Sequence, residues 1–227
     1  MHPLDRPVWS SLASHHAPLS LGNTLARRYA RDINLFAATA DESPASLTAL
    51  SELVAPGEQI FLLQVPALAI PPGCTALKQA LGVQMVATRS LANEATGDDI
   101  VPLTDADAPE MLALARLTEP GPFLVRTHTM GRFLGVRIDG RLAAMAGERM
   151  HLTGYTEVSG VCTHPDFRGH GLARRLSAAV ATQIEARGEQ PFLHAWHSNR
   201  AAITLYETLG FVLRTEVNVA VVSRPAA

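Results

Sequence analysis

Residues 155–188 pass from a strand pattern, through a loop with two glycines, into a helix pattern. The stretch YTEVSGVCT alternates, and this alternation predicts that one face of a strand carries Glu157, Ser159, Val161 and Thr163. The opposite face would carry Val158, Gly160 and Cys162. After the loop, apolar residues recur at helical spacing over LARRLSAAVATQIEARG until Gly188. A helix N-terminus leaves backbone N–H groups without partners, so this unit favours an anion such as a phosphate or pyrophosphate.

Strand and helix patterns alternate on both sides of this unit. Two strand patterns flank Asp139-Gly140, a dipeptide typical of a hairpin with positive φ at both turn residues. A helix is expected over SNRAAITLYETLG, starting at Ser198 or Asn199 and ending at Gly210. From residue 98 the expected order is β-α-β-β-β-loop-α-β-α-β, which indicates the α/β class.

The polar segment ANEATGDDI, residues 92–100, predicts a boundary between a smaller α/β lobe at 1–96 and a main domain at 97–227. In the lobe, a helix is expected after Ser43 or Ser46, and strands are expected over QIFLLQV and VQMVATR. CTALKQALG is expected to form a short helix. The lobe carries no interpretable motif.

Composition limits the classes of partner. Of 227 residues, 47% are hydrophobic and 18% charged, which is enough apolar material for a core. The net charge of −2, without a basic run, argues against nucleic acid binding. The N-terminus lacks a secretory pattern, and the apolar stretch IFLLQVPALAI is too short to span a bilayer. We therefore expect a cytoplasmic protein, with Cys74 and Cys162 as reduced thiols and no membrane partner.

The glycine loop can be compared with three phosphate-binding loops. A P-loop ends in Gly-Lys-Ser/Thr, whereas this loop continues Gly-Leu-Ala. The dinucleotide fingerprint needs a third glycine where Arg174 stands. The pattern R-x-x-G-x-G/A is satisfied by Arg168, Gly171 and Ala173.

With its surroundings, this loop resembles that of the GNAT superfamily of N-acetyltransferases. GVCTHPDFRG is similar to the family's fourth strand and its link to the acetyl-CoA loop, and SNRAAITLYETLGF is similar to its downstream motif. The resemblance covers about residues 98–222 and implies the GNAT fold with a mixed sheet. The lobe before it would then be a degenerate half of such a domain.

The resemblance also implies acetyl-CoA as co-substrate and no metal. Strand residues around Cys162 would contact the pantetheine arm, and the loop from Gly169 to Arg174 would hold the pyrophosphate. The implied cofactor-binding set is Val161, Cys162, Thr163, Arg168, Gly169, His170, Gly171, Leu172, Ala173, Arg174, Asn199, Ala202 and Tyr206. The histidines His164, His170, His194 and His197 match no metal-binding spacing.

Acetyl transfer needs an acid for the leaving thiolate and a base for the amine. The resemblance assigns the acid to Tyr206, whose phenol at a pKa of ~10 can protonate a thiolate of ~8.5. For the base, Glu157, His194 and water stay open. Trp196 and Phe211 are expected in the core.

The expected function is transfer of an acetyl group to a primary amine of a small molecule, such as an amino acid, by a monomer or homodimer. Two alternatives stay open: a non-catalytic acyl-CoA sensor or scaffold, and a protein N-acetyltransferase. The substrate loop is expected at 119–133, where Arg126 or Arg132 would either engage a carboxylate or form a surface salt bridge.

Overall fold

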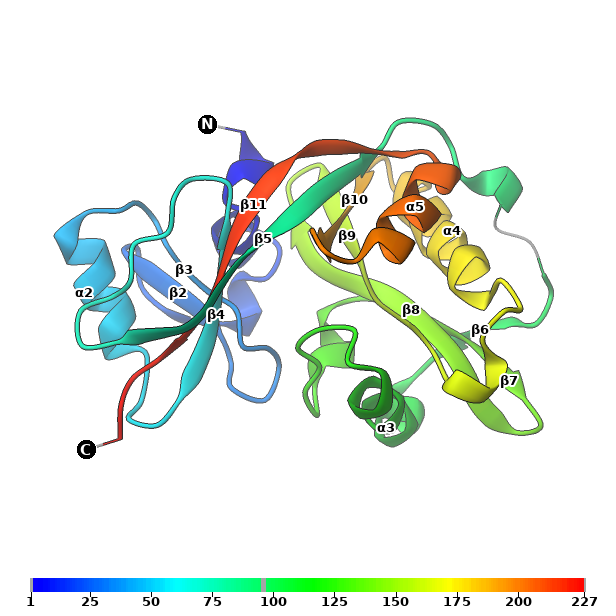
Figure 1. Cartoon of the computed structure of the whole chain (residues 1–227), viewed down its shortest axis with the longest axis horizontal. Helices are drawn as coiled ribbons and strands as arrows, with labels where there is room; N and C mark the ends of the chain where they lie inside the picture. The colour runs from blue at the N-terminus through cyan, green and yellow to red at the C-terminus, as the bar shows by residue number, and fades with distance from the viewer. Residues whose placement is uncertain (1, 95–96, 227) are drawn as a thin grey trace.

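The computed structural model describes residues 2–94 and 97–226 and is built around one large sheet (Figure 1). Its strands, in spatial order, are β4 (Gln59–Gln64), β11 (Phe211–Ser223), β5 (Thr75–Ala87), β10 (Gln190–Trp196), β9 (Tyr155–Thr163), β8 (Arg141–Leu152), β7 (Phe133–Ile138) and β6 (Ile100–Leu103). β9 and β10 pair in parallel, and the other neighbours pair antiparallel. The prediction of an α/β fold with a mixed sheet is confirmed.

Helices cover both faces of the right-hand part of this sheet in Figure 1. Helices α4 (Leu172–Glu185) and α5 (Arg200–Leu209) pack on one face, where Leu176, Val180 and Leu209 join a buried cluster. Helix α3 (Ala108–Thr118) packs on the opposite face against β7, β8 and β9. The described residues also form short 3-10 helices: η1 (Pro3–Asp5), η2 (Ala17–Leu19), η3 (Ala92–Glu94), η4 (Asp105–Asp107), η5 (Thr127–Met130) and η6 (Pro165–Phe167).

The N-terminal segment forms a second, three-stranded sheet of β1 (Ser20–Gly22), β2 (Ala26–Tyr29) and β3 (Ala37–Thr39), with helices α1 (Pro7–Leu12) and α2 (Pro44–Glu52). It lies to the left in Figure 1. Leu12 and Tyr29 belong to the same buried cluster as Met150, Phe192 and Val217 of the large sheet. The N-terminal segment therefore shares a core with the strands that follow it.

Strand β5 corrects the helix expected over residues 74–82. Thr75–Ala87 is a single strand, paired with β11 along its length and with β10 over Gly82–Val86. This pairing overrides the helix propensity of the residues at the start of β5, and Leu77 there is 55% exposed. Because β5 lies between β10 and β11, the large sheet crosses the boundary expected at residues 96 and 97. A division into independently folding units stays a prediction.

Several local expectations are confirmed. The hairpin between β7 and β8 turns at Asp139 and Gly140, whose φ values are 51° and 76°. Asn199 caps α5, and its Oδ1 accepts a hydrogen bond from the Ala202 amide at 3.2 Å. Helix α2 is capped by Ser43, the first of the two expected serines.

The strict alternation expected along β9 is wrong beyond Gly160. Ser159 pairs with Gly147 but Cys162 pairs with Met145, so β9 gains an extra residue at a bulge. Gly160 supplies the positive φ of 62°. As a result Val161 packs against the α4–α5 cluster, as Val158 does, while Cys162 turns to the α3 side.

Both cysteines are free thiols, as expected. Within residues 2–94 and 97–226, no helix is both long and apolar enough to cross a bilayer.

Candidate active site

Strands β9 and β10 separate at their C-terminal ends. Their parallel pairing stops at Glu157 and Phe192, although β9 continues to Thr163 and β10 to Trp196. From Phe192 to Trp196, β10 pairs with β5 on its other edge. The β10-facing edge of β9 beyond Glu157 therefore offers backbone groups to a ligand.

Two pockets meet where these strands separate. The glycine-loop groove, of about 400 Å³, runs along the end of β9 and the start of α4. The inner pocket, of about 260 Å³, lies between β9, β10, the loop after α3 and the N-terminal segment. Residues that line both are Thr118, Val161, Ala202 and Tyr206. The two pockets therefore share a wall that includes Tyr206.

The glycine-loop groove exposes a row of backbone amides. Gly169 and Gly171 have φ values of 85° and 71°, in the left-handed region that favours glycine. The first helical hydrogen bond of α4 runs from the Arg175 amide to the Gly171 carbonyl. The amides just before Arg175 therefore have no partner within the helix, and the positive end of the helix dipole lies beside them.

Most of the expected cofactor residues gather in this groove. Those that line it are Val161, Cys162, Thr163, Arg168, Gly169, Gly171, Leu172, Ala173, Arg174, Ala202 and Tyr206. Asn199 lines the inner pocket instead, and the exposed His170 lines neither pocket.

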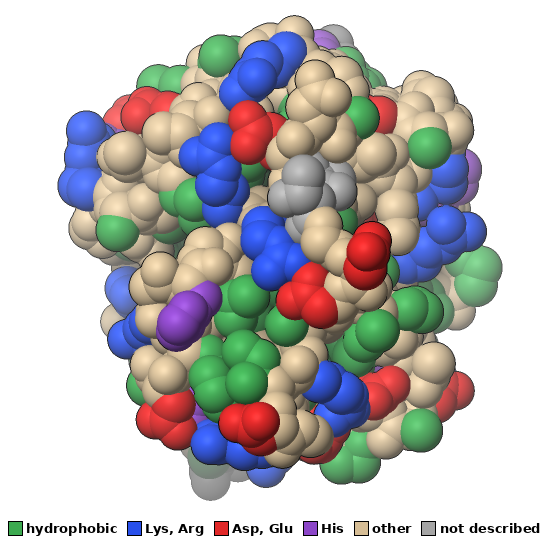
Figure 2. All heavy atoms as spheres, turned by 90° about the vertical axis from the view of Figure 1, so that its right-hand side faces the viewer, with side chains coloured by type: hydrophobic (Ala, Val, Ile, Leu, Met, Phe, Trp, Pro, Cys, Tyr) green, Lys and Arg blue, Asp and Glu red, His purple; other side chains and the backbone are tan. Residues whose placement is uncertain are grey.

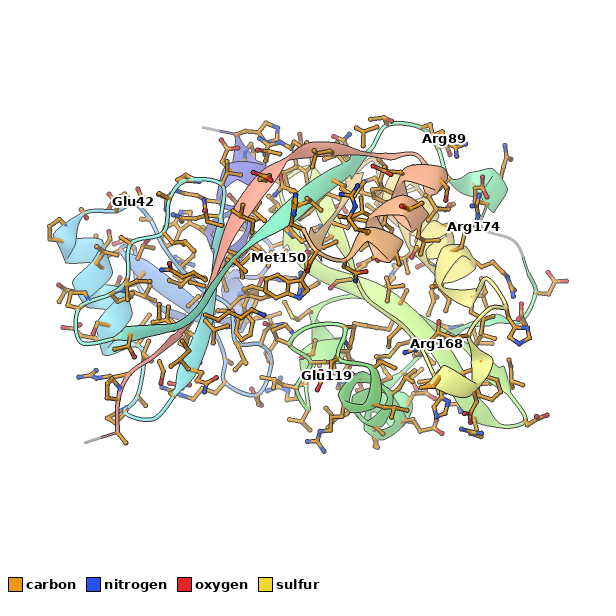
Figure 3. The ribbon with its side chains drawn as sticks, viewed as in Figure 1. Glu42, Arg89, Glu119, Met150, Arg168 and Arg174 are labelled. Atoms are coloured by element: carbon orange, nitrogen blue, oxygen red, sulfur yellow. The ribbon has the colours of Figure 1, made fainter. Side chains whose placement is uncertain are left out.

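The two groove arginines differ in their partners. Arg174 extends toward η3, with its Nη2 2.8 Å from Glu94 Oε2 and its Nη1 3.1 Å from Thr208 Oγ1 (Figure 3). Arg168 has no hydrogen bond or ion pair to its side chain in the described part of the chain. Arg168 is therefore the groove's available cation. On the end of the molecule in Figure 2, arginine and acidic side chains are interspersed rather than gathered in one basic patch.

Tyr206 stands at the junction of the two pockets with 8% of its surface exposed. Helix α5 places it there because Ile203, Tyr206 and Leu209 form the buried face of the helix. Burial, with a smaller contribution from the negative charge of Glu157, raises the pKa of Tyr206 to about 12. The phenol is therefore protonated at neutral pH.

Glu157 is fully buried beneath the inner pocket and forms a two-pronged ion pair with Arg149. The Arg149 Nε–Glu157 Oε2 distance is 2.7 Å and the Nη2–Oε1 distance is 2.6 Å. His194 Nδ1 lies 2.7 Å from the same Oε1. Burial alone would raise the pKa of Glu157, but these partners outweigh it and hold the pKa at about 2.

Hydrogen bonds also occupy both ring nitrogens of His194. The Gln84 Oε1 accepts from Arg214, so the Gln84 amide nitrogen donates to the Leu4 carbonyl and to His194 Nε2, at 2.9 and 3.0 Å. His194 Nε2 is therefore an acceptor, and Nδ1 carries the hydrogen that faces Glu157. The polar row Arg149–Glu157–His194–Gln84–Arg214 crosses five neighbouring strands, from β8 to β11.

Some other residues named from the sequence do not lie where they were expected. Trp196 is 38% exposed and lines the inner pocket, so its expected place in the core is wrong, whereas Phe211 is buried as expected. Trp196 ends β10, with Lys78 Nζ 4.7 Å from its ring centroid. Arg126 pairs with Asp32 at 3.1 Å, and neither Arg126 nor Arg132 lines the inner pocket or the glycine-loop groove.

Sequence reasoning missed part of the inner pocket. The N-terminal segment supplies Phe36 and β4 supplies Phe61 and Leu63 to its wall, and Arg149 of β8 lies beside the Phe36 ring. The sequence carries no local signal for these contacts, since they depend on how distant segments pack. Among the described residues, no group of three or more His, Cys, Asp or Glu is placed to hold a metal ion.

Comparisons with known proteins agree with this geometry. Residues 133–220 match the family model described as FR47-like protein. A solved structure from Novosphingobium aromaticivorans, assigned to the GNAT family of acetyltransferases, is 42% identical over the full length of both chains, with a TM-score of 0.93. A GCN5-related N-acetyltransferase from Kribbella flavida shares the fold at 18% identity, with a TM-score of 0.67 over all of this chain and 97% of that one.

A curated relative is similar over a shorter region. The ribosomal protein bS18-alanine N-acetyltransferase of Salmonella typhimurium is 37% identical over 83 residues, which are 35% of this chain and 55% of that protein. The chain thus spans about half the length of the curated relatives it matches. The full-length similarity, the mixed sheet with its separated strands and the glycine loop lead to one conclusion: the chain belongs to the GNAT family of acetyltransferases.

Proposed function

We propose that this protein transfers an acetyl group from acetyl-CoA to a primary amine of a small molecule, such as an amino acid. The observation that carries the proposal is the place of Tyr206, where the glycine-loop groove and the inner pocket meet. A thioester that enters from the groove and an amine in the inner pocket would come together beside this phenol.

The groove fits acetyl-CoA by the chemistry of its donors. The amides from Gly169 to Arg174 suit the pyrophosphate, and Arg168 adds a cation at the same loop. The free edge of β9 from Val161 to Thr163 suits the amide groups of the pantetheine arm, which would pair as a strand does. Asn199 and Ala202, at the start of α5, would flank that arm.

The transfer step balances with one proton released. The acceptor ammonium first loses a proton to water, and its nitrogen then attacks the thioester carbonyl carbon, forming the C–N bond. Backbone N–H groups of the opened β9 would stabilise the oxyanion. As the C–S bond breaks, Tyr206 gives its proton to the leaving thiolate, and the phenolate takes back the extra proton of the nitrogen. The products are an N-acetylated amine and CoA thiol.

The sequence leaves the base open among Glu157, His194 and water, and the groups around Glu157 favour a positioning role for Glu157 and His194. Both Glu157 oxygens are engaged by Arg149 and His194, and its pKa of about 2 makes it a poor proton acceptor. Both His194 nitrogens are engaged as well. We therefore assign the first deprotonation to water, one of the three candidates.

The size and walls of the inner pocket support a small acceptor. Its volume of about 260 Å³ is bounded on one side by Phe36, Phe61 and Leu63. A protein N-terminus is the second candidate acceptor, favoured by the bS18-alanine N-acetyltransferase similarity. A non-catalytic sensor would not need the phenol of Tyr206 at the junction.

The test is thiol release from acetyl-CoA by the purified protein, with amino acids, polyamines and short peptides as acceptors, and with mass spectrometry of the products. Transfer to free amino acids or small amines supports the proposal. Transfer only to peptides with a matching N-terminal residue supports the protein acceptor. Tight acetyl-CoA binding without thiol release on any amine would contradict an enzyme and favour the sensor.

A further inference from the structure

Glu119 ends α3 in a conformation that residues other than glycine rarely adopt. Its φ and ψ are 49° and 54°, in the left-handed region, and its amide donates to the Ala115 carbonyl at 2.8 Å. The sequence Pro120-Gly121-Pro122 follows. Left-handed backbone at a glutamate costs free energy, so glycine would fit this cap better. Such a departure from the local rule is common where a side chain has a function.

The charged side chains on the wall of the inner pocket do not balance one another, and Glu119 is the reason. The titratable side chains on its wall are Glu119, Arg149, His194 and Tyr206, and the Tyr206 phenol is uncharged at neutral pH. Arg149 is neutralised by Glu157, and both ring nitrogens of His194 are engaged, by Glu157 and by Gln84. Within the described residues, the Glu119 carboxylate has no hydrogen bond or ion pair. The wall therefore presents one uncompensated negative charge.

The position of Glu119 is suited to the acceptor. It directly follows Thr118, which lines both pockets, and it lies on the side of α3 that faces the N-terminal segment (Figure 3). Glu119 is exposed, so solvent reaches its carboxylate. An amine that enters the inner pocket from solvent would pass this carboxylate before it reaches Tyr206.

We propose that Glu119 binds the ammonium group of the acceptor and thereby selects cationic amines for acetylation. This inference rests on the proposed function and adds a binding residue to it. The carboxylate accepts N–H hydrogen bonds from the ammonium, and the released proton leaves through the solvent at this exposed site. Glu119 therefore contributes to acceptor affinity, whereas acetyl-CoA affinity does not depend on it.

The experiment compares Glu119→Gln with the wild-type protein in steady-state acetyl transfer. We expect the KM for the amine to rise about two- to fivefold, as the loss of an ion pair at a solvent-exposed carboxylate implies, with the KM for acetyl-CoA unchanged. The wild-type KM for the amine should also rise with salt, and that of the variant should not. Glu207→Gln is the matched control, because Glu207 is exposed on α5, lines neither pocket and loses the same charge.

Glu119→Gly separates binding from folding. Glycine relieves the left-handed backbone, so the melting temperature should not fall, while the KM for the amine should rise as in Glu119→Gln. An unchanged amine KM in both variants, with wild-type transfer intact, overturns this inference alone. Wild-type protein that acetylates no amine overturns the proposed function and this inference with it.

Discussion

Glu157→Gln is expected to lower the free energy of unfolding at neutral pH, because it removes the charge that Arg149 needs in a buried site. Arg149 and Glu157 are both buried and share two short hydrogen bonds. Removing one partner leaves the other charge uncompensated, and such changes cost about 3–5 kcal/mol. The glutamine keeps the shape of the side chain, so packing should change little.

The pKa gives an independent magnitude and a pH window. The pKa of Glu157 falls from 4.5 to about 2 on folding. A shift of this size corresponds to about 3 kcal/mol. A lowered folded-state pKa means that this stability is fully present above pH 4.5 and is lost as pH falls toward 2. By pH 3, about 2 kcal/mol of it should be gone.

The assay is urea unfolding, followed by tryptophan fluorescence, at several pH values between 7 and 3. The quantity to compare is the wild-type free energy of unfolding minus that of Glu157→Gln, which cancels the titration of other groups. This difference should be about 3 kcal/mol at pH 7 and should shrink below pH 4.5. A difference that stays constant over this range would refute the ion-pair account.

Two further predictions concern the groove and the core. Arg168→Ala should raise the Kd for acetyl-CoA about tenfold, whereas Arg174→Ala should change it little, because Arg174 is engaged by Glu94. Calorimetric titration measures both Kd values, and an equal loss of affinity in the two variants would count against the assignment. Gly147→Ala should destabilise the protein by about 1–3 kcal/mol, because the added methyl group would lie inside van der Waals distance of the Phe133 ring. Thermal unfolding measures this, and a melting temperature equal to that of the wild-type protein would contradict it.

The elements around the glycine loop could be predicted because their signals are local. Helix α4 shows its 3.6-residue period directly, and Asp139-Gly140 specifies its turn through positive φ at both residues. The loop at Gly169 and Gly171 is equally local, since glycine there meets a backbone requirement. Most of the residues that the resemblance then implies for acetyl-CoA line the glycine-loop groove.

Features that depend on strand register could not be predicted. Gly160 fits a regular strand and a bulge equally well in sequence, and only pairing with β8 decides. The row from Arg149 to Gln84 joins residues of β8, β9, β10 and β5, which become neighbours through the topology of the sheet. The helix expected over residues 74–82 is wrong for the same reason, because the partners of β5 are strands more than a hundred residues later, whereas the strand expected over VQMVATR is confirmed for residues 83–87.

Tyr206→Phe tests the central claim most directly, because it removes one oxygen at the junction of the two pockets and leaves the ring in place. Acetyl transfer to the preferred amine and the Kd for acetyl-CoA should be measured on the same preparations, with circular dichroism as the control for folding. The account predicts that kcat falls about a hundredfold or more while the Kd is unchanged. A kcat close to that of the wild-type protein would contradict the role of Tyr206 as the acid of the reaction.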